Sequence, residues 1–377
     1  MSKGSVAIAT LKLIDPATGK FISDYRRQYA IELSGLLREL DYEVAWFQPG
    51  KGWQSLLIPD VPLYGVLQDE AQLFTWPVTS DDFYEKTHEF DWAIYFDFVL
   101  AYPQARESSI AIAHGMTWDE PLFESKLPTE AEREEWKRRL WMALRAPQKV
   151  VAIESGLIHW ATATWPGLFH TFEYIPNFIP AWAKEESPNT EKSNMLESGP
   201  GPIRILFPGP LTPEAGISET IRAMETLLER DDRIHFYWVN TGPEATVKYL
   251  TEWFEKHPRS CLLAEPVTRK TLEQADIVLF PGKSFQETDM ICLAAMSFGK
   301  TVIVGQNSGL ADIVIHDHNG LIINPTEKTL IEGIQHLINS PEERRDLGNH
   351  ARAVARHFTL PAWRQRWQRL IEKTFRE

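Results

Sequence analysis

The first half of the chain alternates short apolar runs with longer segments of helical periodicity. Residues 24–40 place Tyr29, Leu33 and Leu36 on one face of a helix, and residues 129–146 begin with Thr129 and Glu132 in the pattern of a capping box. Apolar runs predict strands at residues 6–11, 42–47, 92–99, 109–113, 150–153 and 173–175. Strands separated by helices predict parallel βαβ units.

A polar segment rich in Pro, Gly and Ser, residues 183–202, predicts a linker, and the same alternation restarts after it. The second half has strand patterns at 204–207, 234–239, 276–280 and 301–304, and helix patterns at 217–230, 245–257, 289–298, 329–338, 341–357 and 361–376. We therefore expect an α/β fold of two Rossmann-like doubly wound domains, residues 1–182 and 203–360, facing across a cleft, with residues 361–377 as a C-terminal helix.

Composition narrows the class of protein. A chain of 377 residues is long enough for two domains, and a formal net charge of -13 argues against a nucleic-acid partner. The two cysteines, Cys261 and Cys292, lie in apolar runs, which is typical of a reduced compartment. Because no signal segment or apolar stretch of membrane-spanning length is found, we expect a cytoplasmic protein.

Residues 281–304, PGKSFQETDMICLAAMSFGKTVIV, begin like a phosphate-binding loop. A Walker loop needs a glycine at the position of Ile277, so this interpretation fails. Neither domain opens with G-x-G-x-x-G, and no HExxH or paired CxxC is present. We therefore expect no metal and no cofactor.

The second half contains five sequence blocks whose order along the chain forms a different pattern from that of a phosphate-binding loop. They are RILFPGPLTPEAGISETIRAME (204–225), HFYWVNTGPE (235–244), ADIVLFP (275–281), LAAMSFGKTVIV (293–304) and SGLADIVIHDHNGLIINP (308–325). This order resembles the nucleotide-sugar domain of the family-four, retaining, GT-B-fold glycosyltransferases. RRQYAIELSGLLRELDYEVAWFQP (26–49), AIAHGMTWD (111–119) and YIPNF (174–178) extend the resemblance, less specifically, into the first half.

The resemblance implies an enzyme that moves a sugar from a nucleotide-sugar donor to a glycan, lipid or protein acceptor, with retention. It also implies a donor diphosphate at a helix N-terminus and a final helix that crosses back to the N-terminal domain. The residues that it singles out are His114 and Gln286 as catalytic, Gly209, Gly242, Lys283, Glu287, Thr288 and Asp289 on the donor side, and Arg27, Trp118 and Asp119 on the acceptor side.

The chain departs from the family at four donor-site positions. Pro210 and Ala215 stand where an Arg and a Lys are expected, and Gln286 and Ala294 replace two Glu. Lys283 with Arg26 or Arg27 could restore the charge, and Glu287 or Asp289 could reach the ribose. The alternative function is a catalytically impaired GT-B protein that acts as a scaffold, binds a glycan or assists a partner transferase.

Two basic segments with aromatic residues, 135–145 and 363–373, admit two interpretations. Amphipathic basic helices can make weak contact with an anionic membrane surface. The same pattern is produced by ordinary helix packing, in which long basic side chains extend over apolar surface.

Overall fold

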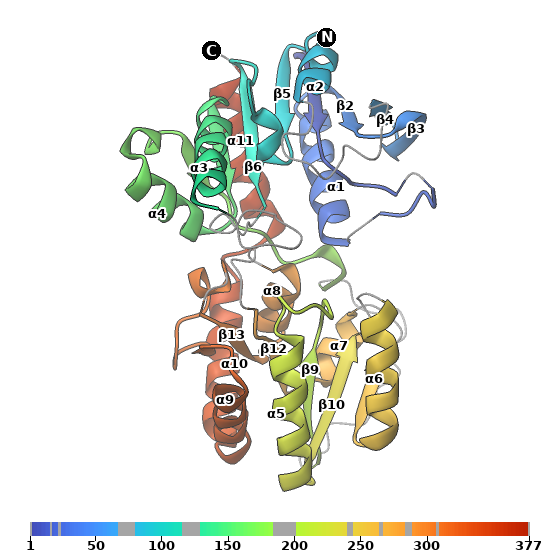
Figure 1. The fold of residues 1–377 in the computed structure, drawn as a ribbon, viewed down its shortest axis with the longest axis vertical. Coiled ribbons are helices and arrows are strands. Elements are labelled where there is room, and N and C mark those ends of the chain that lie inside the picture. The colour runs from blue at the N-terminus through green and yellow to red at the C-terminus, as the bar shows by residue number, and fades with distance from the viewer. Residues whose placement is uncertain are drawn as a thin grey trace. The chain divides into compact units, whose positions relative to one another are not determined.

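The computed structural model describes residues 2–15, 17–21, 24–66, 80–114, 129–183, 201–239, 244–263, 267–282, 289–306 and 309–375. The chain divides into two compact units. Unit 1 comprises Met1–Pro176 and Trp363–Glu377, and unit 2 comprises Asn177–Ala362. Each unit contains a largely or wholly parallel sheet flanked by helices (Figure 1). The expectation of an α/β fold with two such domains is confirmed.

Unit 1 is built on an eight-stranded sheet of order β3-β4-β2-β1-β5-β6-β7-β8. Its strands are parallel apart from the antiparallel pair β3–β4. The elements are β1 (Gly4–Ala9), α1 (Asp24–Glu39), β2 (Tyr42–Gln48), β3 (Lys51–Ile58), β4 (Val61–Val66), α2 (Ser80–Thr87), β5 (Trp92–Tyr95), β6 (Ser109–Ala113), α3 (Glu130–Arg145), β7 (Lys149–Ala152), α4 (Ser155–Thr164), β8 (Phe172–Tyr174) and α11 (Leu360–Thr374).

The central strands of unit 1 are apolar because helices cover both faces of the sheet. In β6 all five residues, SIAIA, are buried, which is the pattern of a strand in a parallel sheet. The predicted capping box of α3 is confirmed, since Thr129 accepts from the Glu132 amide and Glu132 accepts from the Thr129 amide.

The last helix, α11, completes the core of unit 1. Trp363 and Trp367 are buried, and Trp367 Nε1 donates to the Tyr29 hydroxyl at 3.1 Å. Arg364 pairs with Glu32 and Glu39 on α1. The tryptophans of segment 363–373 therefore serve helix packing and are not exposed to a membrane. No helix of the described ranges is long and apolar enough to cross a bilayer.

Unit 2 is built on a six-stranded parallel sheet of order β11-β10-β9-β12-β13-β14. The elements are β9 (Ile203–Phe207), α5 (Ile217–Arg230), β10 (Ile234–Val239), α6 (Glu244–Lys256), β11 (Ser260–Leu263), α7 (Arg269–Gln274), β12 (Ile277–Phe280), α8 (Met290–Ser297), β13 (Thr301–Gly305), β14 (Leu321–Ile323), α9 (Glu327–Asn339) and α10 (Pro341–Ala355).

The boundary between the units falls before the predicted linker. Ile179 N donates to Phe358 O at 2.8 Å, and Ile179 and Ala183 belong to a core cluster around α8 and α10. Residues 177–183 are therefore held in unit 2, whereas the sequence analysis placed the end of the first domain at residue 182. Most of the predicted linker, residues 184–200, lies outside the described residues.

The predicted strand 92–99 was wrong in its second half. β5 ends at Tyr95, and Phe98–Ala101 form a short 3-10 helix whose residues Phe98 and Leu100 are buried. An apolar run continues through both segments, so the pattern alone did not separate a strand from a buried helical turn. This correction places Asp97 in a loop at the edge of the sheet.

Candidate functional site

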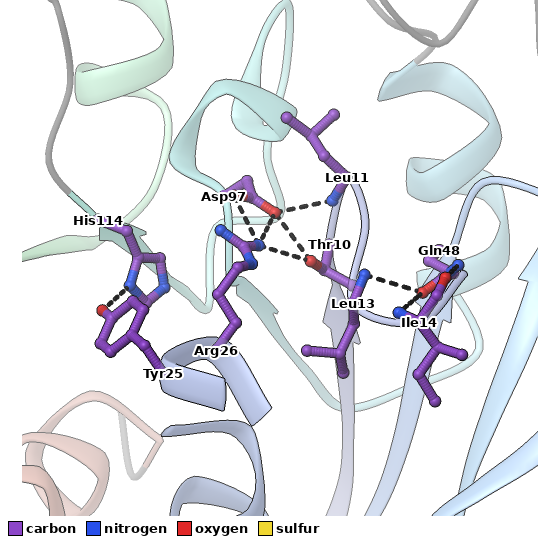
Figure 2. A network of polar contacts seen from close by, with 9 residues as sticks. All are labelled: Thr10, Leu11, Leu13, Ile14, Tyr25, Arg26, Gln48, Asp97 and His114. Carbon is purple, nitrogen blue, oxygen red and sulfur yellow. Dashed lines mark hydrogen bonds and ion pairs between the residues drawn. The ribbon is translucent and has the colours of Figure 1, made fainter. Parts of the chain in front are cut away.

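The carboxyl edge of the first sheet contains a topological switch point. β1 lies between β2 and β5, and the chain passes from β1 to β2 on one side and later enters β5 on the other. The connections that follow β1 and β5 therefore diverge, and ligands bind at such points in doubly wound sheets. Figure 2 shows polar side chains that gather here from the ends of these strands and from the first turn of α1.

Asp97 links the connection after β5, in which it lies, to the connection after β1 and to α1. Its carboxylate accepts hydrogen bonds from Thr10 Oγ1 at 2.8 Å and from the Leu11 amide at 2.7 Å. It also forms an ion pair with Arg26 Nη2 at 2.7 Å (Figure 2). Burial raises the pKa of Asp97, but the charge and hydrogen bonds of Arg26 outweigh it and leave the pKa below its ordinary value.

Gln48 holds the next part of the same loop. Its side-chain oxygen accepts from the amides of Leu13 and Ile14 at 3.0 Å each, and its nitrogen donates to the Ile14 carbonyl at 2.8 Å. The side chain is fully buried, so these bonds are shielded from water. Asp97 and Gln48 together fix the backbone from Thr10 to Ile14.

His114 follows β6 directly and lies beside this network. Its Nδ1 is 2.6 Å from the hydroxyl of Tyr25 on α1 (Figure 2). Tyr25, Tyr29 and Phe96 surround the imidazole, with ring centroids 5.7, 5.0 and 4.3 Å away. The ring is therefore held from three sides.

The surroundings keep His114 uncharged. Burial and then the nearby Arg26 lower the pKa of His114 to about 3, while Asp97 and the Phe96 carbonyl act in the opposite direction. Near neutral pH the side chain is a neutral imidazole, which can donate one hydrogen bond and accept another. It cannot neutralise a phosphate.

The two arginines of α1 have different environments. Arg26 forms an ion pair with Asp97, so the carboxylate balances its positive charge. Arg27 is exposed, and its guanidinium lies over the Phe21 ring at 5.3 Å. Arg27 is therefore exposed and takes no part in the ion pair with Asp97.

Sequence analysis missed Tyr25, Asp97 and Gln48. A polar residue directly after an apolar strand is the signal that marks such positions, and Gln48 in WFQ and Asp97 in YFD both carry it. The signal at Asp97 was missed because the predicted strand 92–99 included this residue, so that it did not stand at a strand end. Tyr25 has no signal of its own, since its partner His114 lies 89 positions away.

Unit 2 has a corresponding switch point between β9 and β12. The connections that follow these strands approach each other closely. Gly216, the N-cap of α5, has a φ of 81°, and a Cβ there would collide with the Pro281 carbonyl. Gly209 also has a positive φ, 89°, in the connection after β9. Glycine is required at Gly216 both for its conformation and for the close approach.

The N-terminus of α8 is occupied by its own cap. Asp289 Oδ1 accepts from the Ile291 amide at 2.6 Å and from the Cys292 amide at 3.3 Å. Burial raises the pKa of Asp289, and these two hydrogen bonds oppose the rise. A carboxylate of the protein thus uses N–H groups of the kind that bind anions at helix N-termini.

Three of the four altered donor-site positions lie in the described part of unit 2, and none of them carries a charge. Pro210 is exposed in the connection after β9, and Ala215 is almost fully buried just before α5. Ala294 is fully buried within α8, in the core cluster that covers one face of the sheet. Neither alanine presents a polar group to a ligand.

Several predicted site residues lie outside the described residues. They are Trp118, Asp119, Gly242, Lys283, Gln286, Glu287 and Thr288. The structure brings none of the described site residues of unit 1 into a metal cluster, and no group of three His, Cys, Asp or Glu within the described ranges could hold a metal ion.

Comparison with known proteins gives a family match in the second half of the chain. Residues 189–354 match the family model of the glycosyl transferases group 1. An uncharacterized glycosyltransferase of Methanocaldococcus jannaschii is 28% identical over 155 residues, which are 39% of this chain and 39% of that protein. The match thus spans about two fifths of that relative.

Solved structures resemble the chain over nearly its whole length. Sucrose-phosphate synthase from Thermosynechococcus elongatus has a TM-score of 0.76 at 16% identity and covers 99% of each chain. Anabaena HepE in complex with UDP has a TM-score of 0.72 at 14% identity, over 99% of this chain and 100% of that one. At such identities the likeness concerns the fold. Residues 189–354 are therefore similar to the glycosyl transferases group 1, and the chain as a whole has the fold of the GT-B glycosyltransferases.

Proposed function

We propose that the protein is a glycosyltransferase that takes a sugar from a nucleotide-sugar donor and transfers it to an acceptor with retention. The observation that carries the proposal is the family match over residues 189–354, because this segment contains the connections after β9 and β12 at the second switch point. HepE, which shares the fold, has been solved with UDP and with UDP-glucose.

In this proposal the nucleotide binds to unit 2, and His114 of unit 1 is a catalytic residue. The connection containing Gly209 and the one that begins at Pro281 border the donor diphosphate, since ligands bind at the carboxyl ends of parallel strands. Lys283 supplies positive charge, and Gln286 bonds sugar hydroxyls as a neutral group. Gly242, Glu287 and Thr288 complete the donor side.

The acceptor side is assigned to Arg27, Trp118 and Asp119. Its acceptor is a glycan, a lipid or a protein. The proposal includes no metal and no cofactor, and catalysis rests on electrostatic stabilisation of the departing diphosphate.

The altered positions reduce this stabilisation. Losing two cations that face a diphosphate removes charge-assisted contacts of about 1.5–3 kcal/mol each. Arg26 does not replace them, since Asp97 balances its charge. Lys283 is therefore the cation on which donor binding depends most, and we expect weak binding of the nucleotide.

A second candidate function is a catalytically impaired GT-B protein that acts as a scaffold or assists a partner transferase. The occupied N-terminus of α8 favours it, because Asp289 competes with a phosphate for the Ile291 amide. The alanines at 215 and 294 favour it too.

A thermal-unfolding panel with UDP, GDP, ADP and their sugars separates the two functions. A ligand present at about 100 times its Kd stabilises the native state by about 2.7 kcal/mol, so a donor nucleotide raises Tm. We expect Lys283→Ala to abolish the shift and Lys328→Ala, an exposed lysine on α9, to preserve it. No shift with any nucleotide at millimolar concentration, together with a stable complex with a second transferase, would establish the scaffold.

Retention is tested on the product. With the donor identified by the panel, the anomeric proton coupling in the NMR spectrum of the first product reports its configuration. We expect the configuration of the donor sugar, and an inverted product would contradict this part of the proposal.

A further inference from the structure

We propose that Tyr25 is a positioning residue that holds His114 in the tautomer with its proton on Nε2, so that the imidazole offers an N–H donor to a ligand oxygen. The function of that donor rests on the proposed transferase activity. The tautomer itself does not.

The chemistry of the two groups sets the direction of the Tyr25–His114 bond. The Oη–Nδ1 distance is 2.6 Å, and the distance alone allows either group to donate. A phenol O–H is a stronger donor than an imidazole N–H, and an unprotonated imidazole nitrogen is a stronger acceptor than a phenol oxygen. We therefore assign the tyrosine hydroxyl as the donor and Nδ1 as the acceptor. Because the imidazole is neutral, its single proton resides on Nε2.

The ring cannot readily exchange its two nitrogens by turning over. Phe96 and Tyr29 contact it, and Tyr29 is itself fully buried against Trp363 and Trp367 of α11. A flip of the imidazole would require this aromatic cluster to move. The Tyr25 bond thus fixes the tautomer, and the cluster fixes the orientation.

The charges that face His114 come from two elements. Arg26 lies on α1 and Asp97 follows β5, and the two form an ion pair with each other. Among the described residues, Tyr25 and Tyr29, both on α1, are the other titratable groups against the ring. Burial and then Arg26 keep the imidazole neutral, and the tyrosine hydroxyl then selects the tautomer.

Nε2 of His114 is buried and has no hydrogen-bond partner among the described residues. A buried N–H group without a partner is costly, and such groups are found where a ligand or a water supplies the acceptor. A sugar hydroxyl or ring oxygen is such an acceptor. In the transferase reaction His114 therefore donates a hydrogen bond to the sugar and does not act as a base.

Nitrogen NMR of the protein with ¹⁵N-labelled histidine tests the tautomer without any ligand. We expect a histidine whose Nδ1 is an unprotonated acceptor and whose Nε2 is protonated, unchanged from about pH 5 to about pH 8. His114→Gln removes this signal and so assigns it. In Tyr25→Phe both nitrogens should move toward the values of a mixture of tautomers.

The matched control is Tyr84→Phe, which removes a hydroxyl from a tyrosine of α2 that lies beside the ring of His88. It should leave the His114 signals in place. A wild-type signal with the proton on Nδ1, a doubly protonated ring, or a Tyr25→Phe spectrum identical to wild type would each overturn the proposal. The wild-type spectrum decides even if Tyr25→Phe does not fold.

Steady-state kinetics test whether Tyr25 contributes to turnover. Tyr25→Phe should lower kcat about five- to tenfold with KM unchanged, since the lost bond orients a group and does not bind the donor. An unchanged kcat would contradict the role in turnover. Absence of turnover by the wild type would count against the proposed function, whereas the NMR spectrum judges the tautomer independently.

Discussion

At the residue scale, His114 and Asp97 make the stability of the folded protein depend on pH, each over a different pH range. The pKa of His114 is lowered to about 3 in the folded protein, against an ordinary value of about 6.5. The unfolded chain therefore takes up this proton first, and stability falls as pH falls below about 6.5. The pKa of Asp97 is also lowered, so its contribution is complete above about pH 4 and is lost only at lower pH.

Replacing His114 by Gln should flatten the loss of stability between about pH 6.5 and about pH 4. The reason is that glutamine does not titrate, so the unfolded state no longer gains a proton at this position. Urea unfolding measured at several pH values checks this. His159→Gln, at an exposed position of α4, is the control, and an equal acid slope in both variants would show that His114 is not buried as a neutral group.

At the element scale, the residue that caps α8 affects both the stability of the helix and the binding of an anion at its N-terminus. This cap, Asp289, satisfies two amides that would otherwise be unpaired and places a carboxylate at a helix N-terminus, a position that favours anions. The cap stabilises the helix and disfavours an anion. Both effects follow from the same two hydrogen bonds.

Asp289→Ala should therefore have opposite effects on stability and on ligand binding. The loss of the cap should cost about 1 kcal/mol of unfolding free energy, while affinity for a nucleoside diphosphate rises because the Ile291 amide is freed and a negative charge is removed. Urea unfolding and calorimetric titration measure the two.

The control for this prediction is Thr326→Ala, which removes the N-cap of α9 in the same unit. It should lower stability by a similar amount and leave nucleotide affinity unchanged. If Asp289→Ala weakened nucleotide binding, the N-terminus of α8 would not be in competition with the ligand.

At the scale of the whole molecule, most of the fold could be predicted from the sequence. Strands such as β10 and helices such as α5 coincide with their predicted bounds, because burial on one or both faces imposes a clear period. The pair β3–β4 was missed, since KGWQSLLI does not alternate cleanly and its turn depends on Asp60 with a φ of 64°.

The candidate site was less predictable than the fold. His114 was found because it lies in a recognisable block, AIAHGMTWD. The partners that define its chemistry, Tyr25, Arg26 and Asp97, come from other elements and meet it only when the sheet is assembled. Sequence spacing carries no record of such contacts.

The assignment of α11 to unit 1 gives a prediction about how the chain unfolds. Trp367 is fully buried, so Trp367→Ala should cost about 3–5 kcal/mol. Hydrogen exchange should become faster in β1 and β5 and stay unchanged in β9 and β12, because α11 from Trp363 onward belongs to unit 1. Trp253→Ala, in the core of unit 2, should give the reverse pattern. Equal acceleration in both units would show that they unfold together.

The central claim is that unit 2 binds a nucleoside diphosphate at the switch point between β9 and β12. Hydrogen exchange of the full chain, with and without UDP, GDP or ADP at millimolar concentration, tests it most directly. We predict that one of these nucleotides slows exchange in the peptides that cover residues 208–216 and 277–292 and leaves α9 and α10 unaffected. Unchanged exchange in both peptides with all three nucleotides would contradict the account.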